Sequence, residues 1–322
     1  MIRLNYEKKD LGPSFALAVA VMIVSSLVLG LVFEAKPTGW QFWLMQALFT
    51  LLIGGSAFMY AAVAKTKVFV ATKLNVAPKY AHVLWGMLAV TFLIACMTPI
   101  NNALLDGIEA LGLRRPSVQL EDNLAGLLIV ACLLPAICEE LVFRGTVAQS
   151  LADSKSKVAA LAISGALFAV FHANPAQTVH QFVLGAFLTL LVLRSNSLWT
   201  SVIVHLFNNT LVVVLSYTAV GAEEFWSFKS NTGVVVACLC VGIIGFILSV
   251  FGYLKTTKSA WKGSESVQGH ELASHVLNKL DNNGKSTQNT VKNSNQNALS
   301  VITLTVAIIV CVVLWISSLF AV

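Results

Sequence analysis

Six polar side chains stand out inside stretches of sequence that are predominantly apolar. They are Glu139, Glu140, Arg144, His172, His205 and Asn209. An ionised group at the middle of an apolar membrane span costs on the order of 2.5–3.5 kcal/mol, so such groups are usually functional. Hydrolysis of a peptide bond needs a base that activates water and hydrogen-bond donors that stabilise the developing oxyanion. Carboxylates and imidazoles can act as the base, and imidazoles and the asparagine side chain can act as the donors.

The two adjacent carboxylates have different neighbours. On a helix, Glu140 and Arg144 lie four residues apart on one face, in the acid-then-base order that favours an ion pair. Glu139 is rotated by about 100° from Glu140 and has no cation on its own face. An unpaired buried carboxylate is unfavourable unless it is used or neutralised. We therefore predict that Glu140 and Arg144 form a supporting pair and that Glu139 is the reactive group.

Helix geometry predicts that the polar residues meet. Glu139 lies about 16 residues before a turn near residues 154–156, and His172 lies about 17 residues after it. At about 1.5 Å per residue, both are roughly 20–25 Å up an antiparallel hairpin. From the turn near residues 195–197, His205 is about 13 Å and Asn209 about 19 Å up the next helix. Three helices therefore supply one polar cluster.

Three further ring side chains accompany this cluster. Phe168 lies four residues before His172, shares its face and is expected to support it. His82 and His180 lie at the starts of two apolar runs. We predict that these two histidines sit at the membrane interfaces and have structural roles.

The composition excludes an ordinary soluble protein. Of 322 residues, 57% are hydrophobic and only 11% are charged, against about 25% charged in a typical soluble domain. The mean hydropathy is +0.79. We predict an all-α fold, a polytopic membrane helical bundle of about nine transmembrane helices. The nine apolar runs are Ser14–Phe33, Trp40–Ala64, Ala81–Ile100, Leu124–Gln149, Val158–His172, His180–Leu193, Leu198–Val220, Gly233–Leu254 and Leu299–Val322.

The basic residues predict the orientation of the bundle. With the N-terminus in the cytoplasm and nine crossings, the cytoplasmic segments hold 16 Lys and Arg residues and the outer segments hold 4. Positive residues concentrate on the cytoplasmic side of membrane proteins. The net charge of +6 is thereby explained without a nucleic-acid partner.

The runs also suggest an organisation into segments. We expect N-terminal transmembrane helices over residues 1–119, a catalytic core over 120–222 and an eighth transmembrane helix over 223–254. Residues 255–298 are rich in Asn, Ser, Lys and Gln, a composition typical of a disordered cytoplasmic loop. The last transmembrane helix is expected over residues 299–322.

Four short motifs in this order resemble the CPBP family, the CAAX-protease and bacteriocin-processing group of type II CAAX prenyl endopeptidases. The motifs are Glu-Glu-x-x-x-Arg at Glu139, Phe-x-x-x-His at Phe168, Phe-x-x-Gly at Phe182 and His-x-x-x-Asn at His205. The resemblance covers about residues 120–215. The first two spans, the polar loop and the last span lie outside it.

This resemblance implies a glutamate-dependent intramembrane endopeptidase without a metal or other cofactor. Glu139 would activate a water, His172 would help to hold it, and His205 and Asn209 would stabilise the oxyanion. Glu140, Arg144 and Phe168 would support them. The implied partners are membrane lipid and a peptide or protein substrate, such as a lipidated protein or a bacteriocin precursor. We expect a bacterial plasma membrane, because the Lys-rich loops contain no organelle signal.

Two alternatives remain open from the residues alone. Glu139, His172 and His205 form a plausible two-His, one-carboxylate ligand set for a metal-dependent peptidase, which metal analysis and chelation would identify. The chain would otherwise be a non-enzymatic immunity or scaffold protein whose function depends on residues 264–295 rather than on Glu139. A serine or zincin mechanism has no support, because neither Gly-x-Ser-x-Gly nor His-Glu-x-x-His is present.

Overall fold

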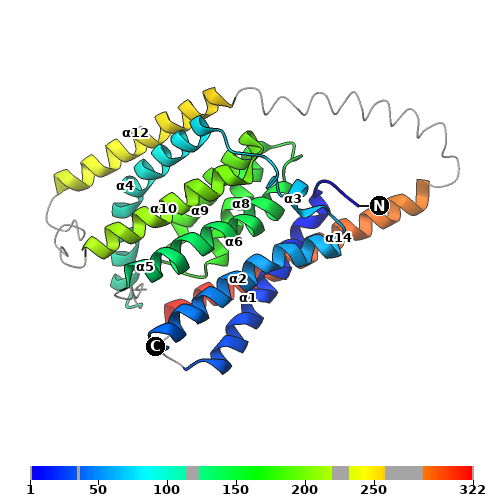
Figure 1. Ribbon diagram of the computed structural model, residues 1–322, viewed down its shortest axis with the longest axis horizontal. Coiled ribbons are helices and arrows are strands. Elements are labelled where there is room, and N and C mark those ends of the chain that lie inside the picture. Colours follow the sequence, from blue (N-terminus) through cyan, green and yellow to red (C-terminus); the bar gives the residue numbers. More distant parts are fainter. Residues whose placement is uncertain (1, 35–36, 114–122, 220–231, 258–285, 321–322) are drawn as a thin grey trace.

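The structure is a computed structural model that describes residues 2–34, 37–113, 123–219, 232–257 and 286–320. Over these residues the chain is helical and contains no β-strand, with a single isolated bridge between Arg3 and Thr66. The predicted all-α helical bundle is therefore confirmed (Figure 1).

The helices follow the apolar runs closely. Their bounds are η1 (Lys8–Asp10), α1 (Leu11–Val32), α2 (Trp40–Val63), α3 (Val68–Ala71), α4 (Tyr80–Ala110), α5 (Leu124–Leu127), η2 (Leu128–Leu133), α6 (Leu134–Val142), η3 (Phe143–Val147), α7 (Ala148–Ser150), α8 (Lys157–Phe171), α9 (Thr178–Ser195), α10 (Leu198–Ala219), α12 (Thr232–Thr256) and α14 (Ser286–Phe320). Within the described ranges, eight helices are long and apolar enough to cross a membrane. The ninth predicted run is α8, an apolar helix of 15 residues.

The short helix α8 is packed against protein along one side. At about 1.5 Å per residue it is roughly 22 Å long, which is shorter than the hydrocarbon core of about 30 Å. It packs mainly against α9 and also contacts η3 and α14. Its Ser164, Gly165 and Phe168 are fully buried or nearly so. The polar Ser164 is acceptable in such a helix because it lies on the side that faces protein.

The fourth span is one continuous helical rod from Leu124 to Ser150, with two π-helical segments, η2 and η3. Pro135 begins the segment after η2 and has no backbone N–H, so the carbonyl four residues earlier lacks its α-helical donor. Widened turns of this kind often occur at functional sites. The rod carries Glu139 and Glu140 in α6 and Arg144 in η3 without a break in the helix, and the depth argument required this continuity.

The bundle has three parts when viewed as in Figure 1. Helices α4 and α12 lie along one edge, and α1, α2 and α14 lie along the opposite edge, with α6, α8, α9 and α10 between them. One apolar cluster joins α1 and α14 to this central part around Phe15, Phe143 and Phe168. A second joins α4 and α12 to it around Leu93, Leu188 and Tyr253. The central helices are therefore packed from both sides.

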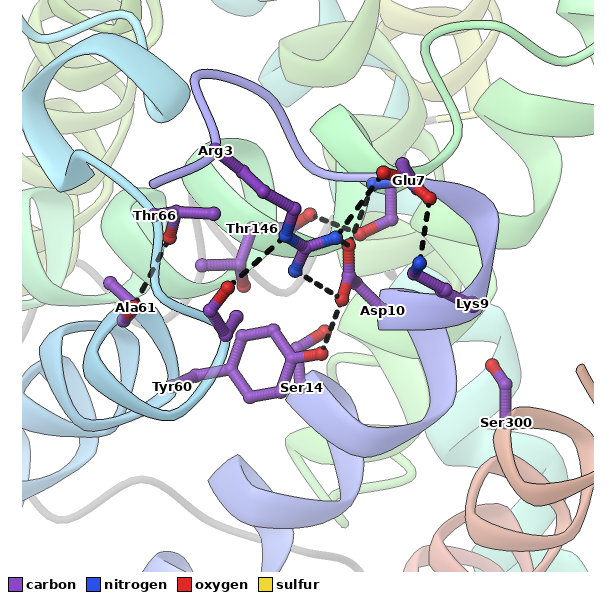
Figure 2. A network of polar contacts seen from close by, with 12 residues as sticks. Arg3, Glu7, Lys9, Asp10, Ser14, Tyr60, Ala61, Thr66, Thr146 and Ser300 are labelled. Atoms are coloured by element: carbon purple, nitrogen blue, oxygen red, sulfur yellow. Dashed lines mark hydrogen bonds and ion pairs between the residues drawn. The ribbon is translucent and has the colours of Figure 1, made fainter. Parts of the chain in front are cut away.

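A polar network fixes the N-terminal arm to the bundle (Figure 2). Asp10 accepts two hydrogen bonds of 2.9 Å from the Arg3 guanidinium and one of 2.8 Å from the Tyr60 hydroxyl. The Arg3 Nε donates to the Ala64 carbonyl at 3.1 Å. Thr146 of η3 lies beside this network. The start of α1 and the end of α2 are thereby linked next to the fourth span.

The last helix runs parallel to the first. The Gly12 amide donates to Ser300 Oγ at 3.1 Å near the start of α1, and the Trp315 indole donates to Thr178 Oγ1 at 2.7 Å near the start of α9. Helix α14 begins at Ser286, so residues 286–298, expected within the polar loop, are helical. Residues 255–256 of that expected loop belong to the end of α12, and residues 258–285 lie outside the described part of the chain.

Candidate active site

Glu139 of α6 is the centre of the polar cluster. Its Oε2 lies 3.8 Å from His172 Nε2 at the end of α8 and 4.0 Å from His205 Nε2 of α10. The side chains of Glu139 and His172 are 19% and 16% exposed, whereas that of His205 is 2% exposed. Glu139 and His172 thus meet at one depth, as the hairpin geometry predicts, and they line the accessible side of the cluster.

Hydrogen bonds fix the orientation of both imidazole rings. His172 Nδ1 is 2.8 Å from the Phe168 carbonyl, which can only accept, so Nδ1 carries the proton of that bond. His205 Nδ1 donates in the same way to Glu140 Oε1 at 2.9 Å. Each ring therefore turns its Nε2 toward Glu139. This arrangement gives both histidines a defined tautomer in the neutral state.

The spacing around Glu139 suits a water molecule. A water about 2.8 Å from each of two atoms bridges separations of 3.8 and 4.0 Å. The ligand atoms of a tetrahedral zinc site lie about 2.0–2.1 Å from the metal, and are therefore closer to one another, at about 3.3 Å. Within the described residues, no group of three His, Cys, Asp or Glu side chains is arranged to hold a metal ion.

Glu140 and Arg144 form a fully buried ion pair behind the cluster. Arg144 Nη1 donates to Glu140 Oε1 at 2.7 Å, and both side chains are 0% exposed. Arg144 Nη2 donates to the Gly185 carbonyl at 3.2 Å, which links the pair to α9. Because Glu140 Oε1 also accepts from His205, the pair holds that imidazole in place. The sequence predicted the ion pair but not its contact with His205.

Phe168 is the apolar support of the cluster. The centroid of its ring lies 4.1 Å from the Arg144 guanidinium carbon. The ring also packs edge to face against the imidazoles of His172 and His205, with ring centroids 4.6 and 6.0 Å apart. A cation over an aromatic face is stabilising, particularly where water is excluded. Gly185 makes this packing possible, since a Cβ there would lie 3.0 Å from Phe168 Cδ1.

Asn209 lies on the same side of α10 as His205 but contacts a different part of the fourth span. Its Nδ2 donates to the Ala131 carbonyl of η2 at 3.3 Å. Ala131 lies four residues before Pro135, so its carbonyl lacks the backbone donor that an α-helix would supply. The proline thus leaves an acceptor that holds the amide of Asn209 toward the fourth span.

Two residues near the cluster were not identified from the sequence as part of it. Asn208 is 2% exposed, and its Nδ2 donates to Asn209 Oδ1 at 3.1 Å. His180 at the start of α9 lies within interaction range of Asn208, His172 and His205, although we predicted a structural position at the interface. The one signal for Asn208 was its spacing of three residues from His205, which places both on one side of the helix.

The other predicted structural histidine lies far from this cluster. His82 is 4% exposed and packs edge to face against Tyr253 of α12, with ring centroids 5.6 Å apart. It belongs to the packing between α4 and α12.

Comparison with known proteins identifies the segment that carries the cluster. Residues 121–211 match the family described as Type II CAAX prenyl endopeptidase Rce1-like. No curated protein and no solved structure matches the chain. The matched segment contains all six predicted polar residues as well as Phe168, and the helices outside it pack around it. Residues 121–211 are therefore similar to the Rce1-like type II CAAX prenyl endopeptidases, in a chain whose described helices include eight that are long and apolar enough to cross a membrane.

Proposed function

We propose that the protein is an intramembrane endopeptidase in which Glu139 and His172 activate a water for hydrolysis of a peptide bond. The observation that carries this proposal is the convergence of His172 Nε2 and His205 Nε2 on Glu139 Oε2, at 3.8 and 4.0 Å. A water held between these atoms has acceptors for its protons on more than one side, and this increases its nucleophilic character.

In the first step, Glu139 takes a proton from the water while the oxygen attacks the carbonyl carbon of the substrate. The C=O bond becomes a C–O⁻ bond of a tetrahedral intermediate. Glu139 then returns the proton to the leaving amine nitrogen as the C–N bond breaks. His172 positions the water through Nε2, because its Nδ1 is already bonded to the Phe168 carbonyl.

The oxyanion is stabilised by His205 and Asn209. Glu140 accepts from His205 Nδ1, which fixes the ring with Nε2 aimed into the cluster. When the ring carries a second proton, Nε2–H donates to the oxyanion. The Asn209 amide supplies a second donor from the same helix. Preorganised donors in a site with little water typically contribute a factor of about 10²–10³ each.

The buried ion pair has a supporting role. Arg144 neutralises Glu140 at a distance of 2.7 Å, so the charge behind His205 is held without water. Two neighbouring carboxylates therefore have separate functions. One is paired and fixed, whereas the other faces the accessible side of the cluster.

The substrate is proposed to be a peptide or protein segment that reaches the site within the membrane. A lipidated protein and a bacteriocin precursor are the two kinds that the family suggests, and a bacterial plasma membrane is the proposed location. The match to a prenyl endopeptidase family makes a farnesylated C-terminal peptide the first probe to use.

Peptidomics of cells that carry either the wild-type protein or Glu139→Gln tests this proposal. The variant keeps the size of the side chain and removes the base. We expect at least one peptide whose processing requires the wild-type protein and stops in the variant. Identical peptide profiles, with equal amounts of both proteins in the membrane, would contradict a peptidase function.

A further inference from the structure

The amide of Asn209 has to face one way to stabilise an oxyanion. A side-chain amide has a donor end and an acceptor end of nearly the same shape. Only its NH₂ end stabilises negative charge, and its oxygen would repel it. Something next to Asn209 must therefore prevent the amide from turning over.

The hydrogen bonds around Asn209 determine this orientation. The Ala131 carbonyl can only accept, so the Asn209 atom that contacts it at 3.3 Å must be Nδ2. Asn209 Oδ1 then faces Asn208, which must donate from its own Nδ2, at 3.1 Å. One backbone carbonyl thus sets the orientation of two successive amides.

This chain of bonds leaves one buried acceptor at its far end. Asn208 is 2% exposed, and its Oδ1 has no hydrogen-bond partner among the described residues. An unpaired buried polar atom costs about 1–3 kcal/mol. His180 is the ionisable side chain of α9 that lies beside Asn208. A ring N–H of His180 is the donor that would complete the chain.

We infer that Asn208 and His180 are positioning residues that hold the Asn209 amide with its NH₂ group toward the reaction centre, an inference that rests on the function proposed above. The relay runs from His180 on α9 through Asn208 and Asn209 on α10 to the Ala131 carbonyl on the fourth span. Neither positioning residue touches the substrate. Together they connect three helices at the oxyanion side of the site.

Kinetics of the purified full chain in lipid vesicles test the relay, with an internally quenched, farnesylated CAAX peptide as the probe. In Asn208→Asp the NH₂ donor becomes an acceptor, so Asn209 loses the partner that fixes its orientation. We expect kcat to fall about 10- to 100-fold with KM changed less than about 2-fold. His180→Phe should act in the same direction, and His180→Gln, which keeps an N–H donor, should recover most of the rate.

A combined substitution separates positioning from general damage. If Asn208 acts through Asn209, Asn208→Asp should add little to the loss already caused by Asn209→Ala. Multiplied losses in the double variant would overturn the relay. Tyr253→Phe is the matched control, because it removes another buried interhelical hydrogen bond, of 2.7 Å to the Leu191 carbonyl, at a distance from the site. It should leave kcat unchanged.

Thermal unfolding of the same variants gives a readout that needs no substrate. The decrease in apparent Tm for the Asn208→Asp, Asn209→Ala double variant should be smaller than the sum of the two single decreases. Additive shifts would contradict the relay. Absence of cleavage by the wild-type protein, together with coupled Tm shifts, would instead contradict the proposed function and leave the relay supported.

Discussion

At the scale of single residues, the site depends on two neighbouring glutamates with different surroundings. Glu140 is fully buried and shares one oxygen between Arg144 and His205. Glu139 is partly exposed, and both histidine Nε2 atoms face it. The separation follows from the rotation of about 100° per residue along an α-helix. Adjacent positions in the sequence thus obtain separate chemical environments.

Arg144→Lys should lower both activity and stability. A lysine keeps the charge but cannot contact Glu140, the Gly185 carbonyl and the face of Phe168 together, as the planar guanidinium does. We expect at least a 10-fold loss of activity and a destabilisation of about 2–4 kcal/mol, as for a damaged buried ion pair. Both are measured on purified protein, by cleavage of a probe peptide and by denaturant or thermal unfolding.

Arg194→Lys is the matched control for this substitution. Arg194 lies in the last turn of α9 and donates to Thr257 Oγ1 and the Leu254 carbonyl, on the side of α12. It should reduce stability with little effect on activity per folded molecule. Equal losses of activity in the two variants would show that Arg144 has no special role at the site.

At the scale of elements, helix packing decides whether the site forms. Helices α8 and α9 approach closely at Gly165 and Gly185, and this closeness lets Phe168 reach both Arg144 and His172. Small residues permit such contacts between membrane helices. The short helix α8 then ends directly before His172, the residue proposed to position the water.

Gly185→Ala should reduce activity through this packing. An added Cβ would lie 3.0 Å from both Gly165 Cα and Phe168 Cδ1, so α8 and α9 must move apart. We expect about a 10-fold or greater loss of cleavage and a destabilisation of about 1–3 kcal/mol. Gly30→Ala, where a Cβ meets no atom within 4 Å among those described, should reduce neither quantity. Normal activity of Gly185→Ala would show that the close approach is dispensable.

Much of this element-level arrangement could be predicted from the sequence. The depths of Glu139 and His172 follow from the residues counted to a shared turn. Rotation about each helix axis and helix-to-helix contacts do not follow from such counts, so His180 and Asn208 were missed. The start of α14 at Ser286 was also missed, because a polar Asn- and Ser-rich composition gives no sign that an apolar helix continues into it.

At the scale of the whole molecule, the Rce1-like segment is enclosed by helices from both ends of the chain. Helices α1 and α14 pack beside α8, and α4 and α12 pack beside α9 and α10. The N-terminal network of Arg3, Asp10 and Tyr60 anchors the first of these helices (Figure 2). The stability of the site therefore depends on residues far outside the matched segment.

Asp10→Asn should destabilise the bundle without a specific effect on catalysis. The change removes the charge that accepts from Arg3 and Tyr60, and charged hydrogen bonds contribute about 1.5–3 kcal/mol. We expect a lower apparent Tm and unchanged kcat at low temperature. Glu7→Gln is the control, because the Glu7 side chain is 55% exposed and its ion pairs should contribute little. A low kcat in Asp10→Asn at full folding would contradict a purely structural role.

The predicted orientation is tested by labelling of single cysteines. With the six native cysteines replaced, Lys155→Cys, between α7 and α8, should be protected from an impermeant maleimide in intact cells. Leu111→Cys, directly after α4, should react. This outcome follows from the excess of basic residues on the cytoplasmic side. The reverse pattern of labelling would invert the orientation.

The central claim is that Glu139 is the base that activates water. Cleavage by purified wild-type protein and Glu139→Gln in the same vesicles, at equal folded concentrations, tests it most directly. We predict that the variant inserts and unfolds like the wild type but loses cleavage by a factor of at least about 10², the lower end of what a positioned general base contributes. Cleavage by Glu139→Gln at the wild-type rate would contradict the assignment.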